Sequence, residues 1–301
     1  MASLLDEPIV RRLRACGLPC RGGALSGAAG DVSGQKKGGN VEFREHRPYA
    51  PGDELRYVDW NVYARTGQLH VKEFSRDQER RVVLRVDASA SMSSGNPPKG
   101  LVALRIAAAL GVVALANGCR VRAAAFTGGA AREGGEHVGA LGEAELLREL
   151  SAVPSPAGST GLGASLRPLL EPGMPRAEVC LVTDLLDPVD PRREITALCE
   201  RGCEVTVIAT WCDADLHPPA GGVLRVRDAE SGEERLVSMG AAEREAYQSS
   251  MRAFEEDWAG FLARHGGRFV PVRTEAPLAT ILFEELRRHR VIADLGSRIA
   301  D

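Results

Sequence analysis

Oxygen-bearing side chains follow one apolar stretch of this sequence at every second position. Residues 81–86 read RVVLRV, and the string D-A-S-A-S that comes next contains Asp87, Ser89 and Ser91. Because alternate residues of an extended chain point to the same side, these three side chains would converge. Carboxylate and hydroxyl oxygens without a nearby Cys or His suit a hard cation, and magnesium fits best, with manganese and calcium as alternatives.

Two more oxygens stand in comparable places further along the chain. Thr160 lies in the string G-S-T-G at residues 158–161, and Asp184 directly follows the apolar residues 179–183. Together with Asp87, Ser89 and Ser91 they form a predicted set of five metal ligands. The simpler interpretation is that the two aspartates cap helices and that the serines only fill a loop.

Strands and helices must position these residues, and the sequence alternates between the two. Short apolar stretches predict strands at residues 81–86, 120–126, 178–183, 204–210 and 268–272. Apolar periodicity and helix-end residues predict helices at residues 4–16, 100–116, 143–150, 192–200, 241–265 and 277–290, and a hairpin is predicted around residues 223–238. Such alternation indicates an α/β fold with a doubly wound, mostly parallel sheet covered on both faces. Function is therefore expected just after residues 86 and 183, at the carboxyl ends of strands.

The composition is that of a globular protein and not of an obvious nucleic-acid binder. The 301 residues are 44% hydrophobic and 26% charged, with a net charge of −3 and 5% aromatic residues. Neither a basic stripe nor a base-stacking surface is expected from these values. The most apolar stretch, residues 101–116, contains Arg105 and is short for a bilayer. A buried helix without membrane insertion is the prediction.

The seven cysteines are odd in number and scattered through the chain. In a chain of this length such usage is typical of reduced thiols, so a cytoplasmic protein is predicted. The pairs Cys16 with Cys20 and Cys199 with Cys203 lack the tight spacing of zinc half-sites. They are interpreted as buried thiols.

Three regions are predicted along the chain. Residues 1–40 comprise an N-terminal helix and a mobile Gly-rich loop at 21–40, and residues 79–301 comprise the α/β domain. Residues 41–78 are dense in Arg, Tyr, Trp and Asp and are expected to pack on or beside that domain, with Trp60 and Tyr63 as buried anchors. In the alternative interpretation the arginines of this segment face a partner protein. These are Arg44, Arg47, Arg56 and Arg65.

The five predicted ligands resemble the metal-ion-dependent adhesion site of von Willebrand factor type A domains. The resemblance covers roughly residues 79–275, and every ligand position of that motif is filled. By this resemblance Asp87, Ser89 and Ser91 come from one loop, Thr160 from a second and Asp184 from a third, and some contacts run through water. Such a site leaves one coordination position open, which an Asp or Glu of a partner protein can fill.

The segment upstream is similar to another family signature, that of the DUF58 family. The similarity is carried by FREHRPY at residues 43–49, PGD at 51–53, VDW at 58–60 and ARTGQLHVKEF at 64–74. Members of that family resemble von Willebrand A domains downstream and are often encoded beside MoxR-type AAA+ ATPases. The resemblance implies an adaptor or co-chaperone that works with such an ATPase or with the ATPase's client protein.

Two other functions remain open from the sequence. A metal-dependent hydrolase of the phosphatase kind would need a general acid two residues after Asp87, but Ser89 stands there and its hydroxyl cannot supply a proton near neutral pH. No G-x-S-x-G elbow occurs either, so an enzyme is not expected. The third possibility is an interaction scaffold that works without metal.

Overall fold

The computed structural model describes residues 4–19, 41–49, 58–76, 80–128, 130–219 and 221–294. The predicted mobile loop at 21–40 and the turn at 51–53 lie outside these residues. The chain divides into two compact units, one formed by Met1–Ala28 with Arg81–Asp301 and the other by Ala29–Arg80. The first unit contains both strands whose ends carry the predicted ligands Asp87 and Asp184.

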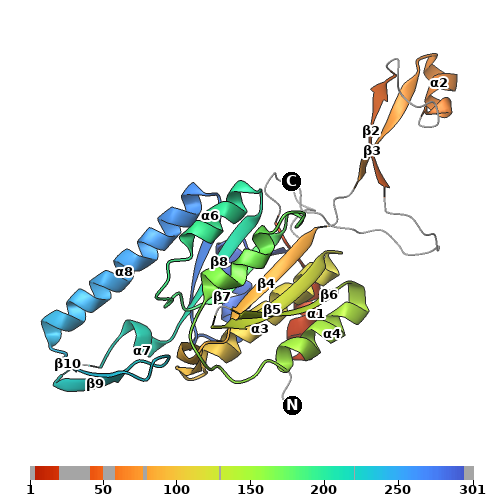
Figure 1. The fold of residues 1–301 in the computed structure, drawn as a ribbon. Helices are drawn as coiled ribbons and strands as arrows, with labels where there is room; N and C mark the ends of the chain where they lie inside the picture. The colour runs from red at the N-terminus through yellow and green to blue at the C-terminus, as the bar shows by residue number, and fades with distance from the viewer. Residues whose placement is uncertain are drawn as a thin grey trace. The chain divides into compact units, whose positions relative to one another are not determined.

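A six-stranded sheet forms the centre of the first unit (Figure 1). Its strands are β4 (Arg81–Asp87), β5 (Arg120–Thr127), β6 (Ala130–His137), β7 (Glu178–Thr183), β8 (Glu204–Trp211) and β11 (Arg268–Arg273). Their order is β11-β8-β7-β4-β5-β6, and every neighbouring pair is parallel except β5 with β6. The order reverses between β4 and β7, which is where a doubly wound sheet binds ligands. The predicted fold class, a doubly wound and mostly parallel α/β sheet, is confirmed.

Helices cover both faces of this sheet (Figure 1). The core therefore consists of two clusters, one on each face of the sheet. Side chains of β4 alternate between them, since Val82, Leu84 and Val86 belong to one cluster and Val83 to the other. The first cluster is formed with α1 (Glu7–Arg14), α3 (Lys99–Ala116) and α4 (Gly139–Ser151). The second is formed with α5 (Leu162–Leu166), α6 (Arg192–Glu200) and α8 (Ala241–Arg264).

Smaller elements complete the first unit. Short 3₁₀ turns span Ala90–Ser93 and Arg167–Leu170, and β1 (Cys16–Gly17) pairs with β12 (Ala293–Asp294). The hairpin of β9 (Val223–Arg227) and β10 (Glu234–Ser238) follows α7 (Asp213–Leu216). The last helical segment contains α9 (Leu278–Thr280), a π-helical turn at Ile281–Glu285 and α10 (Leu286–Arg288). The hairpin prediction is confirmed, whereas β6 is an edge strand that the sequence interpretation lacks.

Helix α3 is the apolar stretch for which a buried position was predicted. Among the described residues it is the one helix long and apolar enough to cross a membrane by length and composition, and 78% of its apolar window is buried inside the unit. It packs closely against α4, because a Cβ built at Gly111 would lie 2.3 Å from Cδ2 of the fully buried Leu146. The prediction of a buried helix is confirmed.

Replacing Gly111 with alanine is expected to destabilise the protein by about 1–3 kcal/mol, because the new methyl group overpacks the contact between α3 and α4. The comparison variant is Gly260→Ala in α8, where the nearest neighbour is the Arg264 Nη1 atom at 3.4 Å. There the helix propensity of alanine should add up to about 1 kcal/mol. Urea unfolding of both variants measures the difference, and a stabilised Gly111→Ala would contradict the close packing.

In its described residues the second unit, Ala29–Arg80, contains a strand pair and one helix. β2 (Val41–Pro48) pairs antiparallel with β3 (His70–Arg76), and α2 (Trp60–Thr66) precedes β3. Val58 forms an isolated bridge with Val71, and both side chains are buried. Trp60 and Tyr63 are 59% and 44% exposed and contact each other edge to face at 6.1 Å between ring centroids. Within this unit the two rings are therefore not buried, and their role as anchors against the first unit stays a prediction.

Candidate metal-ion site

The segment after β4 folds its three predicted ligands into one turn. Asp87 is the last residue of β4 and is 1% exposed, and its Oδ1 accepts a hydrogen bond from the Ser89 backbone N–H at 2.9 Å. Ser89 is fully buried, and its Oγ lies 3.1 Å from Oγ of Ser91 in the following 3₁₀ turn. The structure thus brings Asp87, Ser89 and Ser91 together, as their alternate spacing predicted.

The loop that carries Thr160 is bound to this turn through its backbone. The Ala90 N–H donates to the Gly158 carbonyl and the Ala157 N–H donates to the Ala88 carbonyl, both at 2.9 Å. Gly158 has a φ of +74°, and a Cβ there would lie 2.9 Å from Thr127 Oγ1, so glycine is required for this approach. Thr160 itself is buried.

A carboxylate from the β9–β10 hairpin reaches Thr160. The Thr160 N–H donates to Oε2 of Glu230 at 3.0 Å, and the Thr160 hydroxyl donates to the other oxygen, Oε1. The hairpin turn holds Glu230 in place, since the N–H groups of Glu230 and Ser231 both donate to Asp228 Oδ1 at 2.8 and 2.7 Å. These hydrogen bonds lower the pKa of Asp228. Nothing in the local sequence indicated a contact between residues 70 positions apart.

Asp184 follows β7 and is fully buried, with a donor on each oxygen. Oδ1 accepts from the Leu186 N–H at 3.1 Å, and Oδ2 accepts from Lys99 Nζ at 2.8 Å. Lys99 is 1% exposed and also forms an ion pair with Asp215 at 3.0 Å. Burial lowers the pKa of Lys99, but the charges of Asp184 and Asp215 outweigh burial and leave that pKa above its ordinary value. The Lys99 side chain is therefore a buried ammonium ion.

Sequence reasoning missed Lys99, although one feature pointed to it. Lys99 is the first residue of α3, a helix with no other buried charged residue. A cation at the amino-terminal end of a helix opposes the helix dipole, so a buried lysine at this position requires nearby carboxylates. Asp184 and Asp215 are those carboxylates.

The electrostatics around Asp87 favour a cation. Burial and the neighbouring charge of Asp184 raise the pKa of Asp87 to about 6. Hydrogen bonds from the Thr183 hydroxyl at 2.7 Å and from Ser89 lower this pKa, but by less. Asp87 and Asp184 thus lie close enough, at the ends of adjacent strands, for their charges to interact. A positive ion beside Asp87 would relieve both the burial and the repulsion.

The donor set fits a hard ion. Within the described ranges, no group of three or more His, Cys, Asp or Glu side chains could hold a metal, so a site here would rely on hydroxyls. The turn supplies the Asp87 carboxylate and the hydroxyls of Ser89 and Ser91, which are oxygen ligands of the kind that magnesium takes. Thr160 and Asp184 lie on the two neighbouring loops, with their side chains bonded to Glu230 and Lys99.

Comparison with known proteins gives a family match and distant structural matches. The model of the family described as "Protein of unknown function DUF58" matches residues 45–257. "Uncharacterized protein Rv1480" of Mycobacterium tuberculosis is 32% identical over 275 residues, which cover 88% of this chain and 85% of that protein. "Uncharacterized protein MAV169" of Mycobacterium avium is 28% identical over 155 residues, covering 50% of this chain and 91% of that protein.

Among solved structures, the conserved hypothetical protein BatB from Bacteroides thetaiotaomicron has a TM-score of 0.42 at 15% identity, covering 70% of this chain and 98% of BatB. An aerotolerance-related membrane protein from Bacteroides fragilis has a TM-score of 0.39 at 16% identity, with 69% and 99% covered. Proximal thread matrix protein 1 from the mussel byssus, with a zinc-occupied MIDAS motif, has a TM-score of 0.34 at 12% identity, with 68% of each chain covered. Scores this low add nothing to the fold described above.

Proposed function

This chain belongs to the DUF58 family of proteins of unknown function, and we propose that it is a magnesium-dependent protein-binding adaptor or co-chaperone. It grips an acidic residue of a partner protein through the site at the ends of β4 and β7. The proposed partner is a MoxR-type AAA+ ATPase or the client of such an ATPase, because family members are often encoded beside those ATPases. The proposed location is the cytoplasm.

In this proposal the ion is held by the turn after β4. Asp87, Ser89 and Ser91 supply the ligands, and Thr160 and Asp184 complete the set from the two adjacent loops. The bound ion supplies a positive charge that an acidic side chain can neutralise. The raised pKa of Asp87 supports this assignment, because a buried carboxylate that is costly to ionise gains from a cation beside it.

The contact between Glu230 and Thr160 is the observation that carries the proposal. A carboxylate from a surface hairpin, 70 residues away in sequence, bonds both the N–H and the hydroxyl of a predicted ligand. In the proposal Thr160 must release Glu230 before it can join the ligand set that holds the ion and, through the ion, the partner's Asp or Glu. Glu230 therefore acts as an internal competitor, which a partner must displace from Thr160.

Removal of the internal carboxylate should strengthen partner binding. Glu230→Ala frees Thr160 and its surroundings, so we expect about tenfold more partner to be retained, equivalent to about 1.4 kcal/mol. The measurement is affinity capture from host lysate in magnesium and in chelator, with bound proteins identified by mass spectrometry. Asp228→Ala is the comparison variant: it loosens the turn that holds Glu230, and a smaller gain is expected.

A separate measurement tests the ion itself. Manganese binding, followed by electron paramagnetic resonance, should weaken by at least about tenfold in Asp87→Asn, because even residues that only hydrogen-bond to a ligand typically contribute that much to metal affinity. Asp190→Asn, which changes an exposed aspartate in the loop between β7 and α6, should bind manganese as the wild type does. If partners are captured equally in magnesium, in chelator and by Asp87→Asn, the ion is not the contact and the metal-free scaffold takes its place.

A further inference from the structure

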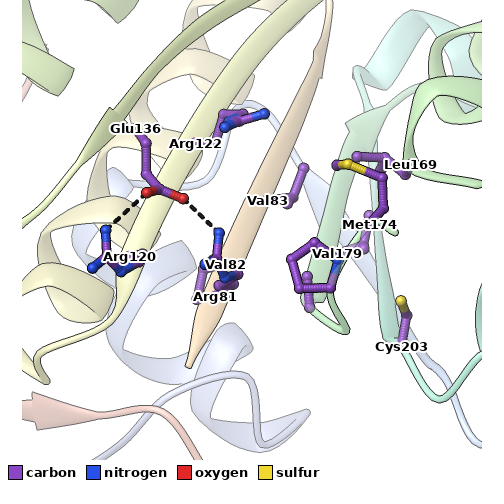
Figure 2. A pocket seen from close by; sticks show the side chains of 12 residues that line it. Arg81, Val82, Val83, Arg120, Arg122, Glu136, Leu169, Met174, Val179 and Cys203 are labelled. Atoms are coloured by element: carbon purple, nitrogen blue, oxygen red, sulfur yellow. Dashed lines mark hydrogen bonds and ion pairs between the residues drawn. The ribbon is translucent and has the colours of Figure 1, made fainter. Parts of the chain in front are cut away.

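A pocket lies at the end of the sheet opposite to Asp87 and Asp184. It has a volume of about 110 Å³ and is formed at the amino-terminal ends of β4, β5 and β7. Figure 2 shows arginines and Glu136 on one side of it and apolar side chains, including Leu169 and Met174, on the other. The pocket shares no residue with the candidate metal-ion site.

The strand register places the arginines of this pocket on one face of the sheet. Arg81 of β4 is paired with Arg120 of β5, and two residues along, Val83 is paired with Arg122. Because paired residues of adjacent strands point to the same face, the three guanidinium groups share it. Strands that are buried on both faces usually have continuous apolar sequences. The arginines at alternate positions of these strands therefore indicate a part of the face that carries charge.

The pocket is lined by three arginines and one carboxylate, which only two of the arginines contact. Glu136 accepts from Arg81 Nη1 at 2.8 Å and from Arg120 Nη1 at 2.9 Å (Figure 2). Arg122 is the register partner of Glu136, yet Figure 2 shows its side chain apart from that carboxylate. Within the described ranges no Asp or Glu forms an ion pair with Arg122. The lining therefore has an excess of two positive charges.

The volume of the pocket and the apolar side chains opposite its arginines indicate what kind of ligand fits it. Sites for cofactors and drug-sized ligands are about 300–1,000 Å³, so a pocket of about 110 Å³ takes a side chain and not a whole cofactor. The guanidinium group matches a carboxylate in shape and charge. Leu169, Met174 and Val179 offer apolar contact on the other side.

We propose that this pocket binds an acidic segment of a partner protein. A carboxylate of the segment pairs with Arg122, and a neighbouring apolar side chain packs against Met174. This surface is separate from the metal-ion site and works without the ion, so the proposal stands independently of the function proposed above. It gives the domain two recognition points for acidic sequences, at opposite ends of the same sheet.

The five methionines of the chain make a direct test possible. The full chain, labelled with ¹³C at the methionine methyl groups, is titrated with acetyl-Gly-Glu-Leu-Gly-amide in chelator and followed by NMR. We expect a saturable shift of the Met174 methyl signal, while the buried Met92 near the metal-ion site stays unchanged. The counterpart peptide with Gln in place of Glu should bind about fivefold more weakly, the loss of one partly exposed ion pair.

Two variants test whether the peptide binds in the pocket or is only attracted to a positively charged surface. Arg122→Gln should lower the affinity for the acidic peptide by about fivefold. Arg167→Gln removes a charge whose side chain is 68% exposed and lies outside the pocket, and should leave the affinity unchanged. The proposal is overturned if the Met174 signal does not move or if the Glu and Gln peptides bind equally. Displacement of the peptide by inorganic phosphate at lower concentration would assign the pocket to a small oxyanion instead.

Discussion

Replacing Lys99 with methionine is expected to lower the free energy of unfolding by about 3–5 kcal/mol, the usual effect of removing one partner from a buried ion pair. The ammonium group is 1% exposed and pairs with Asp184, which is fully buried, and with Asp215. Its loss leaves the Asp184 carboxylate without its counter-charge beside a second carboxylate, Asp87. Urea unfolding in chelator, with wild type and variant at the same pH, measures the change.

Two comparison variants show whether burial causes that loss. Arg288→Met breaks an ion pair with Glu285 whose arginine side chain is 66% exposed, so a change below about 0.5 kcal/mol is expected. Asp184→Asn, added to Lys99→Met, should recover part of the stability because it removes the uncompensated charge. A Lys99→Met effect no larger than that of Arg288→Met would contradict the buried ion pair.

The second large effect is a gain of stability at neutral pH in Asp87→Asn, measured in chelator. The pKa of Asp87 is about 6 in the folded protein, above its ordinary value of 3.8. The folded state therefore holds the proton more tightly than the unfolded state, and the resulting stability is complete below about pH 3.8 and is lost as the pH rises through about 6. At pH 7.5 the ionised carboxylate costs about 3 kcal/mol.

Asparagine keeps the shape of Asp87 and removes its charge, so the variant should be more stable than wild type by about 1–3 kcal/mol at pH 7.5 and nearly equal to it at pH 4. Its amide can donate to the Thr183 hydroxyl, which now donates to Asp87. Magnesium should stabilise the wild type at pH 7.5 and leave Asp87→Asn unchanged. If Asp87→Asn is less stable than wild type in chelator at pH 7.5, hydrogen bonds and not repulsion dominate at this carboxylate.

Local patterns were sufficient to predict most of the sheet and the turn after β4. The strands β4, β5, β7, β8 and β11 are apolar runs that differ from the predicted ranges by at most one residue at an end. Edge strand β6 reads AAREGGEH, which has neither an apolar run nor a regular alternation, so its pairing with β5 had no counterpart in the local sequence. In the same way, Asp87, Ser89 and Ser91 are near neighbours in the chain, and local geometry alone groups them.

The contacts that complete the candidate site come from distant parts of the chain, so local patterns could not supply them. Lys99 and Asp184 are 85 residues apart, and Thr160 and Glu230 are 70 apart. Trp60 and Tyr63 show that residue type does not fix burial within a unit, because both rings are exposed in the second unit and contact each other. Residue type gives an average tendency, and the burial of a particular ring depends on whether a neighbouring element covers it.

The β9–β10 hairpin is expected to open more easily than the sheet that carries the rest of the candidate site. All but one of its ten strand residues are exposed, and it contributes Glu230 to a site whose two predicted carboxylate ligands, Asp87 and Asp184, lie at the ends of buried strands. A segment with so little buried surface opens locally, by subglobal fluctuation, at a small fraction of the free energy of global unfolding. Amide hydrogen exchange should therefore be fast in the hairpin and slow in β4 and β7. Access to Thr160 is then controlled by the opening of one peripheral hairpin, while the sheet stays folded.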